Sequence, residues 1–345
     1  MEKEAIKSYF KNLSLPERKS LLKELEQIDS TDNEAVPRCQ EIRRGILNNK
    51  QGECPHCGHK KYVRFGKDKG SQRYKCKFCH RSFTEYTGTW MAGIHRKDKI
   101  DQYMGLMLEE KSLDKIKAAL KINKKTAFDW RHKILSSLSE VDKGDFTGIT
   151  ESDETFFSYS EKGKKIQGRK PRKRGGSTTG KRGISDDQIA VIVTRDRKKE
   201  IDLTVATRGR LKKIDLENAI GDRLSTHAIL CSDSHVSYKG FAIDKKIEHH
   251  PLRSDLRERV KDGLYHIQHV NSTHNKIKKW IDNKFWGVST KYLQQYMNWF
   301  RMKEILKDSR ELIRNFAEKS AEDTKAHWRH QQIAARYKMI ISSLN

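Results

Sequence analysis

I-T-E-S-D-E-T-F-F-S-Y, residues 149 to 159, is the stretch around which the rest of this 345-residue chain is organised. Thr, Phe and Tyr favour a pleated, half-buried surface, so the run predicts a β-strand. Two adjacent carboxylates, Asp153 and Glu154, lie in its middle, and burying a carboxylate is costly unless a partner uses its charge. We interpret Asp153 as a metal ligand on a central strand. The alternative is an edge strand with two solvated acids.

Two later segments also offer candidate metal ligands. The apolar run 228–231 predicts a strand that ends at Asp233, and residues 269–278, H-V-N-S-T-H-N-K-I-K, predict a helix. Two strand-borne carboxylates and one helix-borne ligand are what a two-metal phosphoryl-transfer site requires. The helix offers three polar residues on one stripe, at positions i, i+3 and i+7: Asn271, His274 and Lys278.

The segments between these motifs predict the topology. Residues 188–194 and 201–207 predict a hairpin after the first strand, 211–220 a short helix, and 228–232 a fourth strand. Residues 247–268 show no clear pattern. This is the ribonuclease H-like order, in which the first and fourth strands are neighbours, so Asp153 and Asp233 are expected to share divalent ions.

Composition restricts the class of partner. The formal net charge is +26, and such a field attracts polyanions and makes their binding salt-dependent. The chain shows no 18-residue apolar run, signal peptide or basic amphipathic anchor, so double-stranded DNA is the expected partner rather than a membrane. Six cysteines without a disulfide pattern suit a reducing compartment, so we expect a cytoplasmic location.

Four of the six cysteines form a metal-binding pattern. They stand in C-P-H-C and C-K-F-C, separated by 2, 18 and 2 residues, which matches a structural zinc ribbon with a closed coordination shell. A ribbon of this kind either binds DNA or braces its neighbour, and its basic strands favour DNA. The predicted zinc ligands are Cys54, Cys57, Cys76 and Cys79.

The region after the ribbon has the pattern of a helix-turn-helix. S-L-D-K-I-K-A-A-L-K-I-N-K-K-T-A-F-D-W-R, residues 112–131, gives a helix, a short turn and a second helix. In the second helix Ala127, Phe128 and Trp130 can pack. Many helical pairs look alike, and the adjacent basic ribbon favours the DNA-binding interpretation. The residues predicted to contact DNA are Lys124, Lys125, Thr126 and Arg131.

A basic insertion follows the first acidic strand. Residues 161–183 hold ten Lys or Arg, one Glu, six Gly and one Pro, which rules out a regular core element. We interpret it as a flexible arm along the DNA backbone, with a solvated loop as the alternative. Its predicted DNA contacts are Arg169, Lys170, Arg172, Lys173 and Arg174.

Together these patterns predict an α+β multidomain protein. The expected parts are a helical segment at 1–48, a zinc ribbon at 49–90, a helix-turn-helix at 91–140, a ribonuclease H-like catalytic domain at 146–302 and a helical tail at 303–345.

Beyond these patterns, the chain resembles the zinc-ribbon insertion-sequence transposases of the DDE superfamily, in particular the ISXO-like group. The resemblance covers roughly residues 50–302 and rests on the ribbon together with six motifs: W-R-H-K-I-L at 130–135, D-E-T-F-F at 153–157, R-K-P-R-K-R-G-G at 169–176, C-S-D at 231–233, H-V-N-S-T-H-N-K-I-K at 269–278 and G-V-S-T-K-Y-L at 287–293. It implies a DNA transposase that acts on terminal inverted repeats, with Asp153 and Asp233 as the first two catalytic ligands for Mg²⁺ or Mn²⁺. It also implies a homodimer or larger synaptic assembly in a cytoplasmic, nucleoid-associated protein of bacterial type.

The third ligand departs from the acid of the superfamily pattern, because no Glu or Asp lies between Asp262 and Asp282. Some members of the group use Asn followed seven residues later by Lys, which fits Asn271 and Lys278. A neutral amide oxygen can ligate a hard cation with less charge compensation. His274 is the second choice, and a purely structural helix face is the third. The missing acid also leaves open two other functions: a DNA-binding regulator on an inactive scaffold, and a nuclease that cuts without joining.

Overall fold

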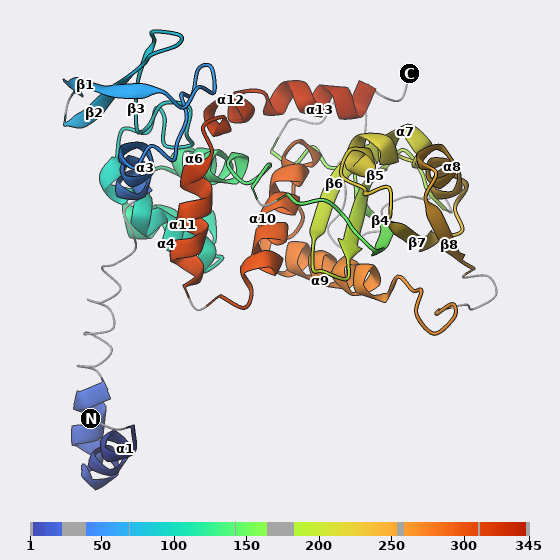
Figure 1. Cartoon of the computed structure of the whole chain (residues 1–345). Helices are drawn as coiled ribbons and strands as arrows, with labels where there is room; N and C mark the ends of the chain where they lie inside the picture. Colours follow the sequence, from blue (N-terminus) through green and yellow to red (C-terminus); the bar gives the residue numbers. More distant parts are fainter. Residues whose placement is uncertain are drawn as a thin grey trace.

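A computed structural model describes residues 3–22, 39–68, 70–141, 143–163, 183–253, 259–309 and 311–342. It is a mixed α/β structure with two sheets and many helices (Figure 1). Every helix within these ranges falls short of the length and apolar content that crossing a bilayer requires. The basic-arm residues expected to contact DNA lie outside the described ranges: Arg169, Lys170, Arg172, Lys173 and Arg174.

The small sheet holds the four-cysteine motif. Its strands are β1 (Tyr62–Asp68), β2 (Ser71–Cys76) and β3 (Ser82–Thr84), joined in that order by antiparallel pairing. The prediction of short strands between the two cysteine pairs is therefore confirmed. The sheet packs against helix α3 (Cys39–Asn48), since the Tyr62 hydroxyl donates to the carbonyl of Leu47 at 2.9 Å. A further helix, α1 (Lys3–Asn12), precedes these elements in the chain.

The predicted helix, turn and second helix are present. The short helix η2 (Lys97–Lys99) and α4 (Ile100–Leu108) lead into α5 (Leu113–Leu120) and α6 (Lys124–Ser136). Side-chain caps begin both helices of the pair: Ser112 accepts from the backbone N–H of Lys115, and Asn123 from that of Thr126. Lys121, with φ of 49°, ends α5 in the left-handed region.

The large sheet has five strands in the order β6-β5-β4-β7-β8. The prediction that the first and fourth strands are neighbours is confirmed: β4 lies at the centre and runs parallel to β7, while β4, β5 and β6 are antiparallel. The strand bounds are β4 (Ile149–Ser158), β5 (Gln188–Asp196), β6 (Ile201–Arg208), β7 (Ile229–Asp233) and β8 (Glu248–Leu252).

Strand β8 was not predicted, because E-H-H-P-L lacks alternation and contains Pro251. A proline is tolerated in this strand because β8 forms the edge of the sheet, where one side of the backbone has no strand partner.

Helices cover both faces of the large sheet (Figure 1). On one face α9 packs on β4 and β5, and α10 packs on β6; on the other, α8 contacts β7 and β8. Two hydrophobic clusters fill these interfaces, and side chains alternate between them along β5. The bounds are α7 (Lys213–Leu216), η3 (Glu217–Gly221), α8 (Val236–Lys245), α9 (Gln268–Phe285), η5 (Thr290–Tyr292) and α10 (Leu293–Leu306).

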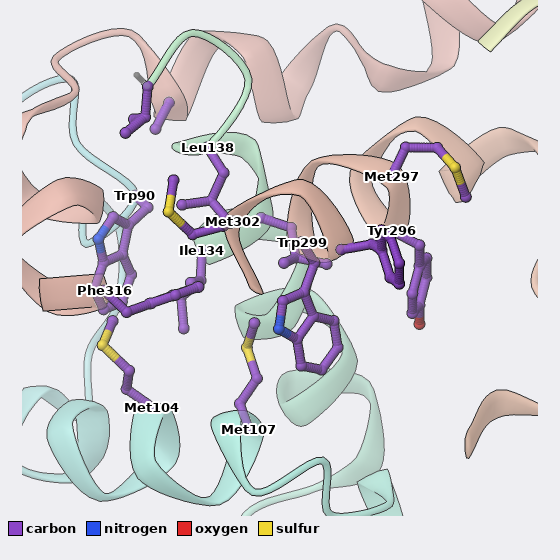
Figure 2. Close-up of a cluster of buried hydrophobic side chains, with 14 of the residues drawn as sticks. Trp90, Met104, Met107, Ile134, Leu138, Tyr296, Met297, Trp299, Met302 and Phe316 are labelled. Carbon is purple, nitrogen blue, oxygen red and sulfur yellow. The ribbon is translucent and has the colours of Figure 1, made fainter. Parts of the chain in front are cut away.

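Helix α10 joins the sheet to the helices of the N-terminal half, because it contacts both β6 and α6. Figure 2 shows Trp299 and Met302 of α10 meeting Met104 and Met107 of α4 and Phe316 of α11. This cluster crosses the predicted boundaries at 140 and 302. The chain ends with α11 (Leu312–Glu322), which packs on α3, and with α12 (Ala326–Gln331) and α13 (Ile333–Ser342), which return along the molecule to β6 (Figure 1).

Candidate active site

The site forms where β4 and β7 separate. Their parallel ladder pairs Ile149 with Ile229, Thr150 with Leu230 and Glu151 with Cys231, and it ends there. Asp153 and Asp233 are each two residues beyond that last pair, so the same register places them opposite one another where the two strands part. The sequence achieves this with a buried run before each acid, Thr150 to Ser152 in β4 and Leu230 to Ser232 in β7.

Asp153 and its neighbour Glu154 leave opposite faces of β4. Asp153 pairs with Val193, which belongs to the cluster under α9, whereas Glu154 pairs with Ile192, which belongs to the cluster under α8. Even so, one oxygen from each of Asp153, Glu154 and Asp233 lies within 4.8 Å of the other two. Three carboxylates therefore converge at the gap, although the sequence led us to expect two.

Helix α9 brings an imidazole to the same place. His274 Nδ1 is 3.9 Å from Asp153 Oδ2, and His274 is 8% exposed. Lys278, one turn further on, is exposed and close enough for its charge to lower the pKa of Asp153. Asn271, the first choice from sequence, is exposed in the first helical turn. Of the two choices from sequence, His274 is the one with a close approach to Asp153.

The electrostatic environment of the site disfavours the ionised form of all three carboxyl groups at once. Burial, then the charges of Glu154 and Asp233, raise the pKa of Asp153 well above its usual value. Burial and the charge of Asp233 also raise the pKa of Glu154. Burial lowers the pKa of His274 to about 4, so its imidazole is neutral near pH 7 and keeps a lone pair.

These residues fit a divalent cation. Carboxylate oxygens are the ligands that Mg²⁺ and Mn²⁺ prefer, and a neutral imidazole is a suitable further donor. Among the described residues, three buried polar atoms at the site lack a hydrogen-bond partner: Glu154 Oε2, His274 Nε2 and the hydroxyl of Tyr238. Asp233 has one oxygen in use, since Oδ1 accepts from the backbone N–H of His235 at 3.0 Å.

Another buried carboxylate, that of Glu151, holds α9 against the sheet, and the sequence did not identify it as a site residue. Glu151 is 1% exposed, and its Oε2 accepts from the backbone N–H groups of His269 at 2.9 Å and Val270 at 3.3 Å. Its Oε1 lies 2.6 Å from His269 Nδ1 and 3.2 Å from Arg197 Nη2. Glu151 therefore caps the first turn of α9, whose own N-cap residue provides no side-chain hydrogen bond. The sequence feature that could have identified Glu151 is its position two residues before Asp153 in the predicted strand.

The four predicted cysteines also converge. Cys54 Sγ lies 3.7 Å from Cys79 Sγ, and Cys57 Sγ lies 3.7 Å from Cys76 Sγ. Tetrahedral coordination with Zn–S bonds of about 2.3 Å separates sulfurs by about 3.8 Å, so the cluster has the dimensions of a zinc site. Burial raises the pKa of the Cys76 thiol, but hydrogen bonds from the backbone N–H groups of Cys79 and Phe78 and with the thiols of Cys57 and Cys79 together lower it to about 7. Burial raises the pKa of the neighbouring Cys54 thiol to about 12. A low thiol pKa favours the thiolate that zinc binds.

The residues predicted to contact DNA through α6 divide into two groups. Lys124 and Lys125 are exposed and Thr126 is partly exposed at the start of the helix. Arg131 is 2% exposed and donates to the carbonyl of Lys111 at 2.9 Å, so its guanidinium braces the interior and is not available to a DNA groove. The pattern of charges along α6 did not reveal that this side of the helix faces α10.

Comparisons with known proteins find a family match for part of the chain. Residues 145–304, a little under half of the chain, match the family model described as the ISXO2-like transposase domain. The matched region contains all three carboxylates, His274 and Lys278.

Two further similarities are weaker. A Halobacterium salinarum protein, described as an uncharacterized protein in transposable element ISH50, is 30% identical over 147 residues, which cover 42% of this chain and 49% of that protein. The chain therefore spans about half the length of this curated relative. A crystal structure of a pre-cleavage Mos1 transpososome aligns at 11% identity, covering 64% of this chain and 78% of that one, with a TM-score of 0.19. A score this low supports no conclusion about the transposase domain.

Proposed function

We propose that the chain is a DNA transposase that cleaves the ends of its own element and joins them to target DNA at a metal site on a ribonuclease H-like sheet. The observation that carries this proposal is the convergence of Asp153 and Asp233 at the open ends of two parallel neighbouring strands, inside a transposase domain. Such a pair can hold the cations of a phosphoryl-transfer site without a covalent enzyme intermediate.

The roles of the residues follow from their positions. Asp153 and Asp233 hold Mg²⁺ or Mn²⁺, which supplies Lewis-acid activation of the nucleophile and stabilisation of the leaving oxygen. His274 is the proposed ligand from α9, in preference to Asn271, because its ring adjoins Asp153. The exposed ammonium of Lys278 faces the same opening and binds a phosphate oxygen beside the scissile bond.

Partner DNA is proposed to contact two basic surfaces. The exposed start of α6, with Lys124, Lys125 and Thr126, and the zinc-loaded small sheet bind the terminal repeats. The basic insertion at 161–183 binds flanking or target DNA. Because two element ends must be brought together, the active species is a homodimer or a larger assembly.

The test is cleavage of a DNA fragment that carries the flanks of the chain's own gene, with Mg²⁺ or Mn²⁺. We expect metal-dependent cuts at the flanks that Asp153→Asn and Asp233→Asn abolish, while Asp244→Asn, an exposed acid paired with Lys213, cuts like the wild type. Among α9 variants, His274→Ala is expected to lose far more activity than Asn271→Ala.

The competing function is a DNA-binding regulator, and the absence of an acid from the part of α9 before Asp282 is the observation that favours it. Tight, salt-sensitive binding to the flanks with no cuts under either metal would establish that function instead. Cuts without donor DNA covalently linked to target would reduce the proposal to a nuclease.

A further inference from the structure

The carboxylate that α9 lacks has a replacement elsewhere in the site. Two divalent cations and a phosphodiester need more negative charge than Asp153 and Asp233 supply, and His274 is neutral. Between Asp262 and Asp282 the sequence contains no acid, and Asp282 itself is exposed about two turns beyond His274, so the part of α9 at the site does not provide that charge. The charge has to come from another element.

Glu154 is the acid within reach. It is adjacent to Asp153 in the strand and leaves the opposite face of β4, so in a continuous sheet the two carboxylates would be separated by the backbone. The ladder between β4 and β7 ends at Glu151 and Cys231, however, and no β7 backbone pairs with β4 beyond that point. The longer Glu154 side chain reaches into this gap, where one of its oxygens lies within 4.8 Å of oxygens of both Asp153 and Asp233.

The surroundings of Glu154 leave part of its coordinating capacity unused. Its Oε2 is buried and forms no hydrogen bond of normal geometry among the described residues. The hydroxyl of Tyr238, which is 0% exposed, lies close enough to act against the effect of burial on the pKa of Glu154. Tyr238 lies on α8, packed beneath this corner of the sheet. A buried carboxylate oxygen without a donor is costly unless a cation or a proton occupies it.

We propose that Glu154 is the third carboxylate ligand of the catalytic metal site, in place of the acid that the helix lacks. The metal is then held by two adjacent residues of β4 that approach from opposite faces of one strand, by Asp233 from β7, and by the neutral His274 from α9. This inference rests on the proposed function for its catalytic meaning, but metal binding can be measured without any DNA.

The experiment is Mn²⁺ binding to the full chain without DNA, followed by the electron paramagnetic resonance signal of free Mn²⁺. We expect Glu154→Gln to weaken Mn²⁺ binding about tenfold or more, as Asp233→Asn does. Glu248→Gln, the same substitution at an exposed position of β8, serves as the matched control and should bind like the wild type. Glu154→Asp shortens the reach across the gap and should bind with intermediate affinity.

Folding is checked by thermal unfolding without added divalent metal, where Glu154→Gln should melt at or above the wild-type temperature because it removes a repelled charge. Wild-type Mn²⁺ affinity in folded Glu154→Gln, with affinity lost in Asp153→Asn, would overturn the role of Glu154 and leave the proposed function standing. Mn²⁺ affinity unchanged in all of these variants would overturn both.

Discussion

At the residue scale, the proposed role of Asp153 as a metal ligand opposes the stability of the protein. The pKa of Asp153 is raised well above the usual value, so the native state takes up a proton that the unfolded state has already released. The stability associated with this carboxyl is fully present below the unfolded pKa of about 3.9 and is lost as pH rises through the folded pKa. A bound divalent cation reverses this cost.

We therefore predict that Asp153→Asn stabilises the protein by about 1 kcal/mol at pH 8 without added divalent metal, and has little effect at pH 4. Addition of Mn²⁺ should stabilise the wild type and not the variant. Urea unfolding at the two pH values, with and without Mn²⁺, measures both effects. A variant that is less stable than the wild type at pH 8 would show that Asp153 is not strained by its neighbours.

Site residues could be predicted from the sequence where their residue type is unusual for its surroundings. Asp153, Asp233 and the four cysteines stand out because carboxylates in β-prone runs and paired thiols have few structural uses. Whether Asn271 or His274 lies nearer Asp153 depends on how α9 is rotated about its axis. The sequence does not show this rotation, because the i and i+3 spacing places both residues on the same side of the helix. Only the packing against β4 distinguishes them.

At the scale of elements, Glu151 sets where α9 begins. It is a strand residue that supplies the cap that the helix does not supply for itself, and Arg197 pairs with it at 3.2 Å. Because α9 also carries His274, this cap fixes the distance between the imidazole and Asp153.

We predict that Glu151→Ala destabilises the protein by about 3 kcal/mol, since it leaves two backbone N–H groups of α9 without their buried acceptor, whereas Arg197 keeps its bond to the carbonyl of Leu264. Glu304→Ala, which removes an acid paired with Arg195 of β5, should cost less because no helix cap is lost and Arg195 keeps its bond to Thr273. Urea unfolding gives the free energies, and amide hydrogen exchange at His269 and Val270 reports the cap directly. Slow exchange of these amides in Glu151→Ala would contradict the capping role.

The small sheet depends on its thiolate cluster, because only three short strands and a few aromatic side chains form its core. We predict that Cys76→Ser lowers bound zinc from about one ion per chain to nearly none. Cys231→Ser, a buried cysteine of β7 outside the cluster, should keep the zinc. Metal analysis of the purified variants decides. Full zinc content in Cys76→Ser would rule out the four-cysteine site.

Element order was the most predictable property of the chain, because buried runs and turns appear locally in the sequence. The edge strand β8 was not predictable, since E-H-H-P-L carries neither alternation nor β-branched residues and is ordered by pairing with β7. The inward orientation of Arg131 was also hidden, because it depends on α10, which lies more than 150 residues further along the chain.

At the scale of the whole molecule, Gly88 lies against the C-terminal helices. Its φ is +79°, and a Cβ added there would lie 2.2 Å from the carbonyl oxygen of Thr324. The backbone N–H of His327 donates to the Gly88 carbonyl at 3.0 Å, so the loop before α4 and the start of α12 are joined at this point.

We predict that Gly88→Ala destabilises the protein by about 3 kcal/mol or more, because backbone strain is added to a clash with another backbone. Gly66→Ala is the matched control: its φ is +69°, but a Cβ there meets nothing within 4 Å, so we expect a loss of about 1 kcal/mol. Thermal unfolding of the two variants compares them. Equal losses would mean that the contact with Thr324 contributes nothing.

The packing of α11 on α3, and of α10 between α6 and β6, also limits how such genes can exchange parts. In the linear gene the cysteine motif and the helix pair come first and the carboxylates come later. This order suggests two halves that recombination between related genes could exchange. In the folded chain the first half is completed by helices encoded after the last residue of the proposed site. A single crossover between the codons for α6 and β4 would unite a foreign α3 with a resident α11, and their shared surface would no longer match. On the proposed function, a new DNA specificity would therefore be inherited together with the 3′ end of the gene, or arise by substitutions within the first half.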